Sequence, residues 1–217
     1  MASEARAGGD GAGGGVNGRA DSGSYGAGGT HDGSPRGARA EPGVRVRRIA
    51  DGDWDAIVAL EAAAYTPLGI SEGRAPLESK VRASPDTCLA LDVGGRTAGY
   101  LLALPYPPSA YPELSRGEQT VFRSANLHLH DLVIAADLRG RGLGRRMLGR
   151  LTADAARQGF ERISLVAVGG SHTFWSAAGF RAHEGAVDSG GYGPDSVYMS
   201  LPLRTAGTPT PDEVGGA

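Results

Sequence analysis

A short run of glycines and arginines in the second half of the chain has the composition of a phosphate-binding loop. The run Arg139-Gly140-Arg141-Gly142-Leu143-Gly144 follows a strand-like segment and leads into a helical pattern that continues to about Gln158. The start of a helix offers unpaired backbone N–H groups and partial positive charge, and glycine lets a pyrophosphate approach the backbone. Arginines at 139, 141, 145 and 146 add cationic charge. The loop therefore predicts a phosphate-bearing cofactor.

The spacing of the glycines narrows the kind of cofactor. A dinucleotide loop needs G-x-G-x-x-G, but counting from Gly140 or from Gly142 places Arg145 or Met147 in the last position. A Walker A loop needs a Gly-Lys-Ser/Thr ending, which does not occur here. The pattern that does fit is R-x-x-G-x-G. A solvated loop before a helix is the structural alternative for so short a pattern.

Two histidines, His128 and His130, precede this loop at strand spacing. Such spacing should point both imidazoles to one face, which Leu132 and Ile134 continue, with Asp131 on the opposite face. Histidine titrates near neutral pH and can accept a proton from a substrate. A metal site and buried structural histidines are the alternatives. Two histidines are too few ligands for a closed metal site, and no third ligand stands at a useful spacing.

Length and composition set the context for these motifs. The chain has 217 residues and a formal net charge of −2, which suits one domain with a tail and gives no electrostatic reason to expect nucleic acid or a membrane as partner. The single cysteine, Cys88, excludes an internal disulfide, and we expect it to be a small buried hydrophobe. There is no long apolar run and no signal-peptide pattern at the N-terminus, so a cytoplasmic protein is expected.

The elements that must position the motifs lie between two tails. Residues 1–43 and 205–217 are rich in small and polar residues and are expected to be disordered, which leaves a folded domain at 44–204. Within it, alternation, helical periodicity and Gly/Pro punctuation predict the order β-α-α-β-β-β-α-β-α-β-β. The expected strands are 44–49, 87–93, 96–104, 127–135, 162–168, 180–183 and 196–201. The expected helices begin at Asp51 or Asp53 and end at 65, and span 76–83, 145 to about 158, and 172–178.

This order, the R-x-x-G-x-G loop and a second motif together resemble the GCN5-related N-acetyltransferase (GNAT) superfamily. The second motif is Ser171-His172-Thr173-Phe174-Trp175-Ser176-Ala177-Ala178-Gly179-Phe180, in which Gly179 should end a helix and Phe180 should return to the core. The resemblance covers 44–204. It implies an α/β (α+β-like) fold with a mixed central sheet of about seven strands flanked by about four helices.

The resemblance also implies the ligand and its contacts. Acetyl-CoA would be the acyl donor, with no metal. The backbone of the strand before the loop would bind the pantetheine arm and polarise the thioester carbonyl. The implied cofactor-binding residues are Leu132, Val133, Ile134, Arg139, Gly140, Arg141, Gly142, Leu143, Gly144 and Arg145.

The implied reaction is direct attack of an amine on the thioester in a ternary complex. His130 is the expected general base and His128 would relay protons. Trp175 stands where many relatives have a tyrosine that protonates the leaving thiolate, and an indole cannot take that role. A non-catalytic acyl-CoA-binding module with the same fold is therefore the alternative function.

The acceptor is expected to be a small-molecule amine, with a protein amine as the second possibility, and the chain to be a monomer or homodimer. Tyr65, Tyr106, Tyr111, Glu113 and Glu118 lie in segments that would form the acceptor cleft. Acidic and aromatic groups there suit a cationic or arylalkyl amine, although surface solubility explains them equally well. Polyamines, arylalkylamines, amino acids, antibiotics and protein amines all remain open.

Overall fold

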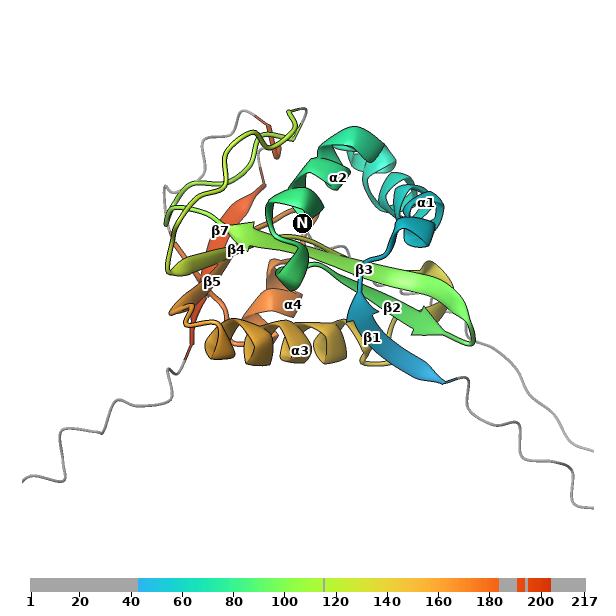
Figure 1. Ribbon diagram of the computed structural model, residues 1–217. Coiled ribbons are helices and arrows are strands. Elements are labelled where there is room, and N and C mark those ends of the chain that lie inside the picture. Colours follow the sequence, from blue (N-terminus) through green and yellow to red (C-terminus); the bar gives the residue numbers. More distant parts are fainter. Residues whose placement is uncertain (1–42, 115, 184–190, 194, 204–217) are drawn as a thin grey trace, which may run out of the picture. The chain divides into compact units, whose positions relative to one another are not determined.

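A seven-stranded mixed sheet with helices on both faces forms the centre of the domain (Figure 1). The computed structural model describes residues 43–114, 116–183, 191–193 and 195–203. The expected tails, apart from Gly43, lie outside these residues, so their disorder stays a prediction. Among the described residues, no helix is long and apolar enough to cross a membrane.

The elements follow one another in the predicted order, which confirms the α/β fold. The strands run in the spatial order β1-β2-β3-β4-β5-β7-β6, and of the six neighbouring pairs only β4 with β5 is parallel. The strands are β1 (Val44–Arg48), β2 (Leu89–Val93), β3 (Arg96–Pro105), β4 (Asn126–Ile134), β5 (Arg162–Ala167), β6 (Arg181–Ala182) and β7 (Val197–Pro202). The helices are α1 (Trp54–Tyr65), α2 (Arg74–Ala83), α3 (Leu143–Arg157) and α4 (His172–Ala177).

The helices divide the core into two layers. α1 and α2 cover one face of the sheet, and α3 and α4 cover the other (Figure 1). Residues of α3 bury one stripe against the sheet, because its apolar positions recur every three or four residues. The buried apolar members of this stripe are Leu143, Met147, Leu148, Leu151 and Ala155.

Some predicted boundaries are wrong by a few residues. α2 begins at Arg74 rather than at Pro76, and α3 begins at Leu143, inside the glycine loop. Asp53 sits at the start of α1 but makes no side-chain cap. Its carboxylate instead accepts bonds from Arg47 (2.6 and 2.7 Å) and Thr97 (2.7 Å), which ties the helix start to β1 and β3.

β4 and β5 separate part of the way along their length. Their parallel pairing comprises Asn126–His128 with 162–164. Beyond that point β4 continues to pair with β3 as far as Ile134, while β5 continues to pair with β7 as far as Ala167. The separation leaves an opening in the middle of the sheet, which we call the β4–β5 gap.

β4 also contains a β-bulge. Ala103 of β3 pairs with Leu129, but the next residue, Leu102, pairs with Asp131. His130 is therefore the extra residue on β4. A bulge of this kind interrupts the alternation of side chains between the two faces of a sheet.

The bulge corrects the predicted directions of the side chains on β4. Leu132 and Ile134 lie in the core under α3 and α4 and do not continue the face of the histidines. Asp131 does not point away from His130, because its carboxylate lies within 4.8 Å of that imidazole. His128, His130 and Asp131 all lie on the α1/α2 side of the sheet.

Candidate active site

The glycine loop ends as the N-terminus of α3. Gly142 is the N-cap, with a positive φ of 75° that favours glycine, and the carbonyl of Gly142 accepts a bond of 3.0 Å from the backbone N–H of Arg146. The N–H groups of the preceding turn, from Leu143 to Arg145, therefore have no intrahelical acceptor. They lie at the positive end of a 15-residue helix, an arrangement that suits an anion.

Gly144 lies in this turn, and packing within the protein does not require a glycine there. A Cβ at this position would meet Phe174 Cζ at 3.6 Å and the side chains of Ile134 and Leu132 at 3.9 Å, which are ordinary van der Waals contacts. A glycine here leaves the backbone of the turn accessible to the close approach of a ligand. The same contacts show that the loop adjoins β4.

The arginines around the loop point in different directions. Arg139 Nε donates to the carbonyl of Ile134 (3.1 Å), so it joins the loop to the end of β4. Arg141 and Arg145 are exposed beside the helix start. The guanidinium of Arg146 donates to the carbonyl of Val44 in β1 (3.1 Å), and its contribution to the charge of the loop stays a prediction.

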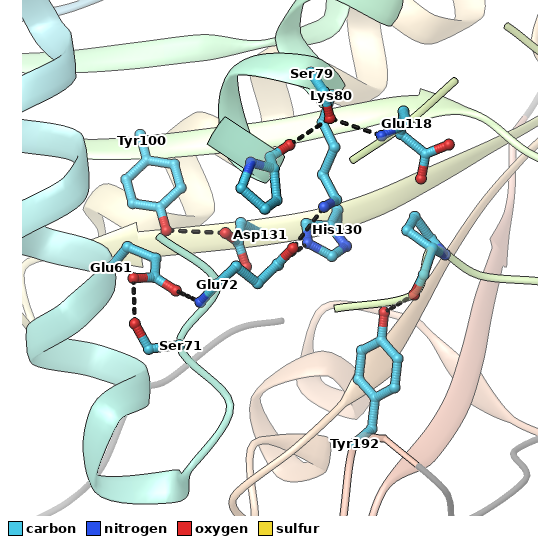
Figure 2. Close-up of polar contacts among 12 residues, drawn as sticks. Glu61, Ser71, Glu72, Ser79, Lys80, Tyr100, Glu118, His130, Asp131 and Tyr192 are labelled. Carbon is cyan, nitrogen blue, oxygen red and sulfur yellow. Dashed lines mark hydrogen bonds and ion pairs between the residues drawn. The ribbon is translucent and has the colours of Figure 1, made fainter. Parts of the chain in front are cut away.

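On the other face of the sheet, a buried chain of hydrogen bonds ends at His130. Lys80 Nζ on α2 lies 2.6 Å from Glu72 Oε2, and Glu72 Oε1 lies 2.5 Å from His130 Nε2 (Figure 2). The three side chains are 0%, 2% and 0% exposed. Sequence reasoning missed Glu72, which lies 58 residues from His130, and it missed Lys80.

The chain of bonds indicates which nitrogen of His130 carries the proton. Paired with the ammonium of Lys80, Glu72 acts as a carboxylate and accepts the Nε2–H of a neutral imidazole. Nδ1 then presents its lone pair, and it has no hydrogen-bond partner among the described residues. Burial lowers the pKa of His130 well below its usual 6.5, and burial raises the pKa of Glu72. His130 is thus a neutral imidazole with one free basic nitrogen.

His128 is held at the point where the two strands separate. Its Nδ1 lies 3.2 Å from Ser164 Oγ, and that hydroxyl also accepts a bond of 2.9 Å from Asn126 Nδ2. The ring centroids of His128 and His130 are 6.4 Å apart, so the two rings are too far from each other for a direct hydrogen bond. Burial lowers the pKa of His128 as well.

The cluster around His130 contains a third group that could bind a metal, contrary to the expectation from spacing. Ligand atoms of Glu72, His130 and Asp131 lie within 4.8 Å of one another. Each carboxylate already has a donor, since Lys80 bonds to Glu72 and the hydroxyl of Tyr100 donates to Asp131 (2.9 Å). These bonds account for the cluster without a cation, and the expectation of no metal stays a prediction.

The second motif contains α4, and the chain leaves this helix at Gly179 as predicted. Gly179 has a φ of 95°, and Phe180 is buried in the core under α3 and α4. Trp175 is fully buried, with ring centroids 4.9 Å from Phe174 and 5.3 Å from Phe180. Its Nε1–H and the buried hydroxyl of Ser171 have no hydrogen-bond partner in the described part of the chain.

Two cavities lie near the cluster around His130, and Glu72 lines the larger of them. The larger has a volume of about 730 Å³, the smaller about 240 Å³, and both are lined by Ile70 and Tyr192. Of the residues expected in an acceptor cleft, Tyr111 and Glu113 line the larger cavity. The other three do not line either cavity. Tyr106 and Glu118 line a separate cavity of about 210 Å³, and Tyr65 is buried in the core.

Comparison with known proteins relates this chain to a protein family and to several solved structures. Residues 54–180 match the Acetyltransferase (GNAT) family. No curated protein matches the chain. Similar solved structures include the GNAT-like decarboxylase GphF in complex with isobutyryl-CoA, with 23% identity over 74% of this chain and 100% of that chain and a TM-score of 0.59. Ard1 from Thermoplasma volcanium has 12% identity over 74% of this chain and 98% of that chain, with a TM-score of 0.56.

A third similar structure belongs to a longer protein. N-acetylglutamate synthase from Neisseria gonorrhoeae, complexed with coenzyme A and N-acetyl-glutamate, has 16% identity and a TM-score of 0.58. The match covers 76% of this chain but only 36% of the synthase. At these identities the solved structures show a shared fold.

Proposed function

Since the chain belongs to the acetyltransferase (GNAT) family, we propose that it is an acetyl-CoA-dependent N-acetyltransferase that transfers the acetyl group directly to an amine. The observation that carries this proposal is the free Nδ1 of His130, a buried base whose other nitrogen is bound to Glu72. Acetyl-CoA, the donor substrate, would supply the thioester.

The β4–β5 gap and the glycine loop support the donor site. Backbone groups of Leu132, Val133 and Ile134 border the gap and would bind the pantetheine arm. The loop from Arg139 to Arg145 would bind the pyrophosphate through its N–H groups and its arginines. Similar structures complexed with coenzyme A and with isobutyryl-CoA support this class of ligand.

His130 would remove the proton that keeps the acceptor unreactive. An amine arrives as an ammonium ion, and Nδ1 accepts one of its protons, directly or through water and His128. The nitrogen then attacks the carbonyl carbon, so that a C–N bond forms and the C–S bond breaks. Coenzyme A leaves as a thiolate, which takes up the second proton that the nitrogen loses. A backbone N–H of β4 would donate to the carbonyl oxygen as it gains negative charge.

The alternative function, a binding module that holds acyl-CoA without turnover, is favoured by one observation. Trp175 replaces the tyrosine that would protonate the leaving thiolate, and its indole is buried among aromatic rings. Turnover with any amine would contradict this alternative.

The first experiment measures acetyl-CoA-dependent thiol release across a panel of amines, with mass spectrometry of the product. The wild-type chain is suitable because burial raises the pKa of its single thiol, Cys88, to about 12 and keeps it from contributing background. We expect turnover that declines as the pH falls through the pKa of His130. That pKa is lowered, so the acid limb of kcat/KM should lie below pH 6.5.

His130→Gln is expected to reduce kcat by a factor of about 10² to 10⁴, as is typical for loss of a general base. The Kd for acetyl-CoA should stay unchanged, because the imidazole lies on the α1/α2 face, away from the glycine loop. His128→Gln is the matched control on the same strand and should cause a smaller loss. A double variant with an unchanged pH–rate profile would contradict the assignment of both histidines.

A further inference from the structure

The larger of the two cavities near the cluster around His130 has a composition that can select an acceptor. Three segments that are distant in sequence form its walls: the loop before α2, the segment that follows β3, and the segment that precedes β7. It is lined by Gly69, Ile70, Ser71, Glu72, Tyr111, Pro112, Glu113, Leu114, Gly191 and Tyr192. Because Glu72 lines the cavity and is bonded to His130, Glu72 lies between this cavity and the proposed base.

The charges on the described walls have one sign. Glu72 and Glu113 line the larger cavity and Asp195 lines the smaller one, whereas no described lining residue of either cavity is Lys, Arg or His. A cation is attracted to such walls, and a carboxylate on the ligand would find no basic partner there. This pattern disfavours an amino acid as acceptor.

The remaining walls include two aromatic rings and two aliphatic side chains. Tyr111 and Tyr192 meet edge to face, with centroids 5.2 Å apart at 85°. The hydroxyl of Tyr192 donates to the carbonyl of Pro112 (2.5 Å), which fixes that ring (Figure 2). Ile70 and Leu114 add aliphatic surface. Rings held in this way suit a flat apolar group, and an aromatic face also attracts an ammonium.

The number of carboxylates argues against a polyamine. An extended polycation is held by several free carboxylates along its length. Here the buried carboxylate, Glu72, is already paired with Lys80, and the other two, Glu113 and Asp195, are exposed on different segments. One ammonium group with an apolar remainder matches these walls better.

The lining of the smaller cavity includes residues that follow β5. The cavity shares Ile70 and Tyr192 with the larger one and is also lined by Val168, Gly169 and Gly170. β5 is one border of the β4–β5 gap, next to the proposed donor site.

We propose that the acceptor is a primary amine with a single positive charge, a ring-sized apolar group and no carboxylate. The ring would lie against Tyr111 and Tyr192, and the amine would point toward Glu72 and His130. This inference rests on the proposed function, because it identifies the class of acceptor for that same site.

The test compares matched amines in the thiol-release assay. 2-Phenylethylamine is compared with phenylalanine, which adds a carboxylate, with n-butylamine, which lacks the ring, and with spermidine, which adds charges. We expect kcat/KM for 2-phenylethylamine to exceed each of the others by about tenfold or more, since burial of a ring contributes at least that much affinity. An equal or higher value for phenylalanine, n-butylamine or spermidine would overturn the proposal.

A pair of variants tests the position of the ring. Tyr111→Leu removes the aromatic wall and should raise KM for 2-phenylethylamine about tenfold, while Tyr111→Phe keeps the ring and should change KM by less than about threefold. Neither variant should change KM for acetyl-CoA. Thermal melting of both variants verifies that they fold. A KM that is equally affected by both variants would contradict the ring contact.

Calorimetric titration of 2-phenylethylamine into the protein with coenzyme A separates the two proposals. Binding without turnover of any amine would support the cavity assignment and overturn the proposed function. Turnover confined to amino acids or polyamines would support the function and overturn the inference. Neither binding nor turnover would overturn both.

Discussion

His130 can accept a proton at only one nitrogen, because the other is hydrogen bonded to Glu72. A carboxylate that accepts the Nε2–H fixes the tautomer and the orientation of the ring. The ammonium of Lys80 favours the ionised form of that carboxylate, whereas burial opposes it. We therefore infer that Lys80 positions the proposed base, His130, through Glu72.

Lys80→Met should move the acid limb of kcat/KM to higher pH. Without the ammonium, burial raises the pKa of Glu72 further, so Glu72 becomes protonated at a higher pH. A protonated Glu72 donates to Nε2 and forces the imidazole proton onto Nδ1, which removes the base. The change should also cost about 3–5 kcal/mol of stability, as is typical when one partner of a buried ion pair is removed. The pH–rate profile and a denaturant titration measure the two effects.

Lys80→Arg is the control for this prediction, because it keeps a positive charge on the same turn of α2. Its acid limb should stay closer to that of the wild type. Other titratable groups face the same cluster and also affect the pH–rate profile. These groups are Glu61, Tyr65, Tyr100, Glu118, His128, Asp131 and Tyr192. The profile of Lys80→Met must therefore be compared with that of Lys80→Arg. An unchanged profile in Lys80→Met would contradict the positioning role.

The sequence predicts the local part of the site and misses the part formed by tertiary contacts. The histidine pair and the glycine loop are visible because their residues lie close together in the chain. Glu72 follows a loop and Lys80 lies in a largely polar helix, so both look solvated in the sequence. Only tertiary packing, including that of α2 against β3, buries their side chains beside His130.

At the scale of elements, the order of helices and strands was predictable but the bulge was not recognised. Strict alternation placed Leu132 and Ile134 on the face of the histidines. The apolar residues in fact show the irregularity, because Leu127 and Leu129 are two residues apart and the next leucine of the same core is three residues further on. One extra residue moves every later side chain to the other face.

The first turn of α3 offers a prediction that separates ligand binding from folding. Gly144→Ala places its Cβ at ordinary contact distances, and alanine favours a helix over glycine by about 0.5–1 kcal/mol. We therefore expect a stability equal to or above that of the wild type. The Kd for acetyl-CoA should rise about tenfold or more, because the proposed pyrophosphate contact needs a close approach to the bare backbone of this turn. Thermal melting and calorimetry measure the two quantities.

Gly149→Ala is the matched control, since this glycine lies on the same helix and its Cβ would meet nothing within 4 Å. It should give the same gain in stability and leave the Kd for acetyl-CoA unchanged. If Gly144→Ala bound acetyl-CoA as tightly as Gly149→Ala does, the pyrophosphate would not lie at this turn.

At the scale of the whole described domain, the sheet consists of two parts joined at a short seam. β1 to β4 form one antiparallel part, and β5, β7 and β6 form the other. The three residue pairs of β4 with β5 and the helices on both faces hold the parts together. Local patterns in the sequence predicted the strands and their order, but not which strands pair within each part.

The β4–β5 gap also bears on the solubility of the protein. Strands that separate inside a sheet leave two rows of unsatisfied N–H and C=O groups, and such edges invite the addition of strands from other molecules. Without ligand, the chain is therefore expected to self-associate on warming, and coenzyme A should delay the rise in light scattering. Adenosine 3′,5′-bisphosphate, which lacks the pantetheine arm, is the control and should delay it less. Equal protection by both would mean that the edges inside the gap are not where the molecules associate.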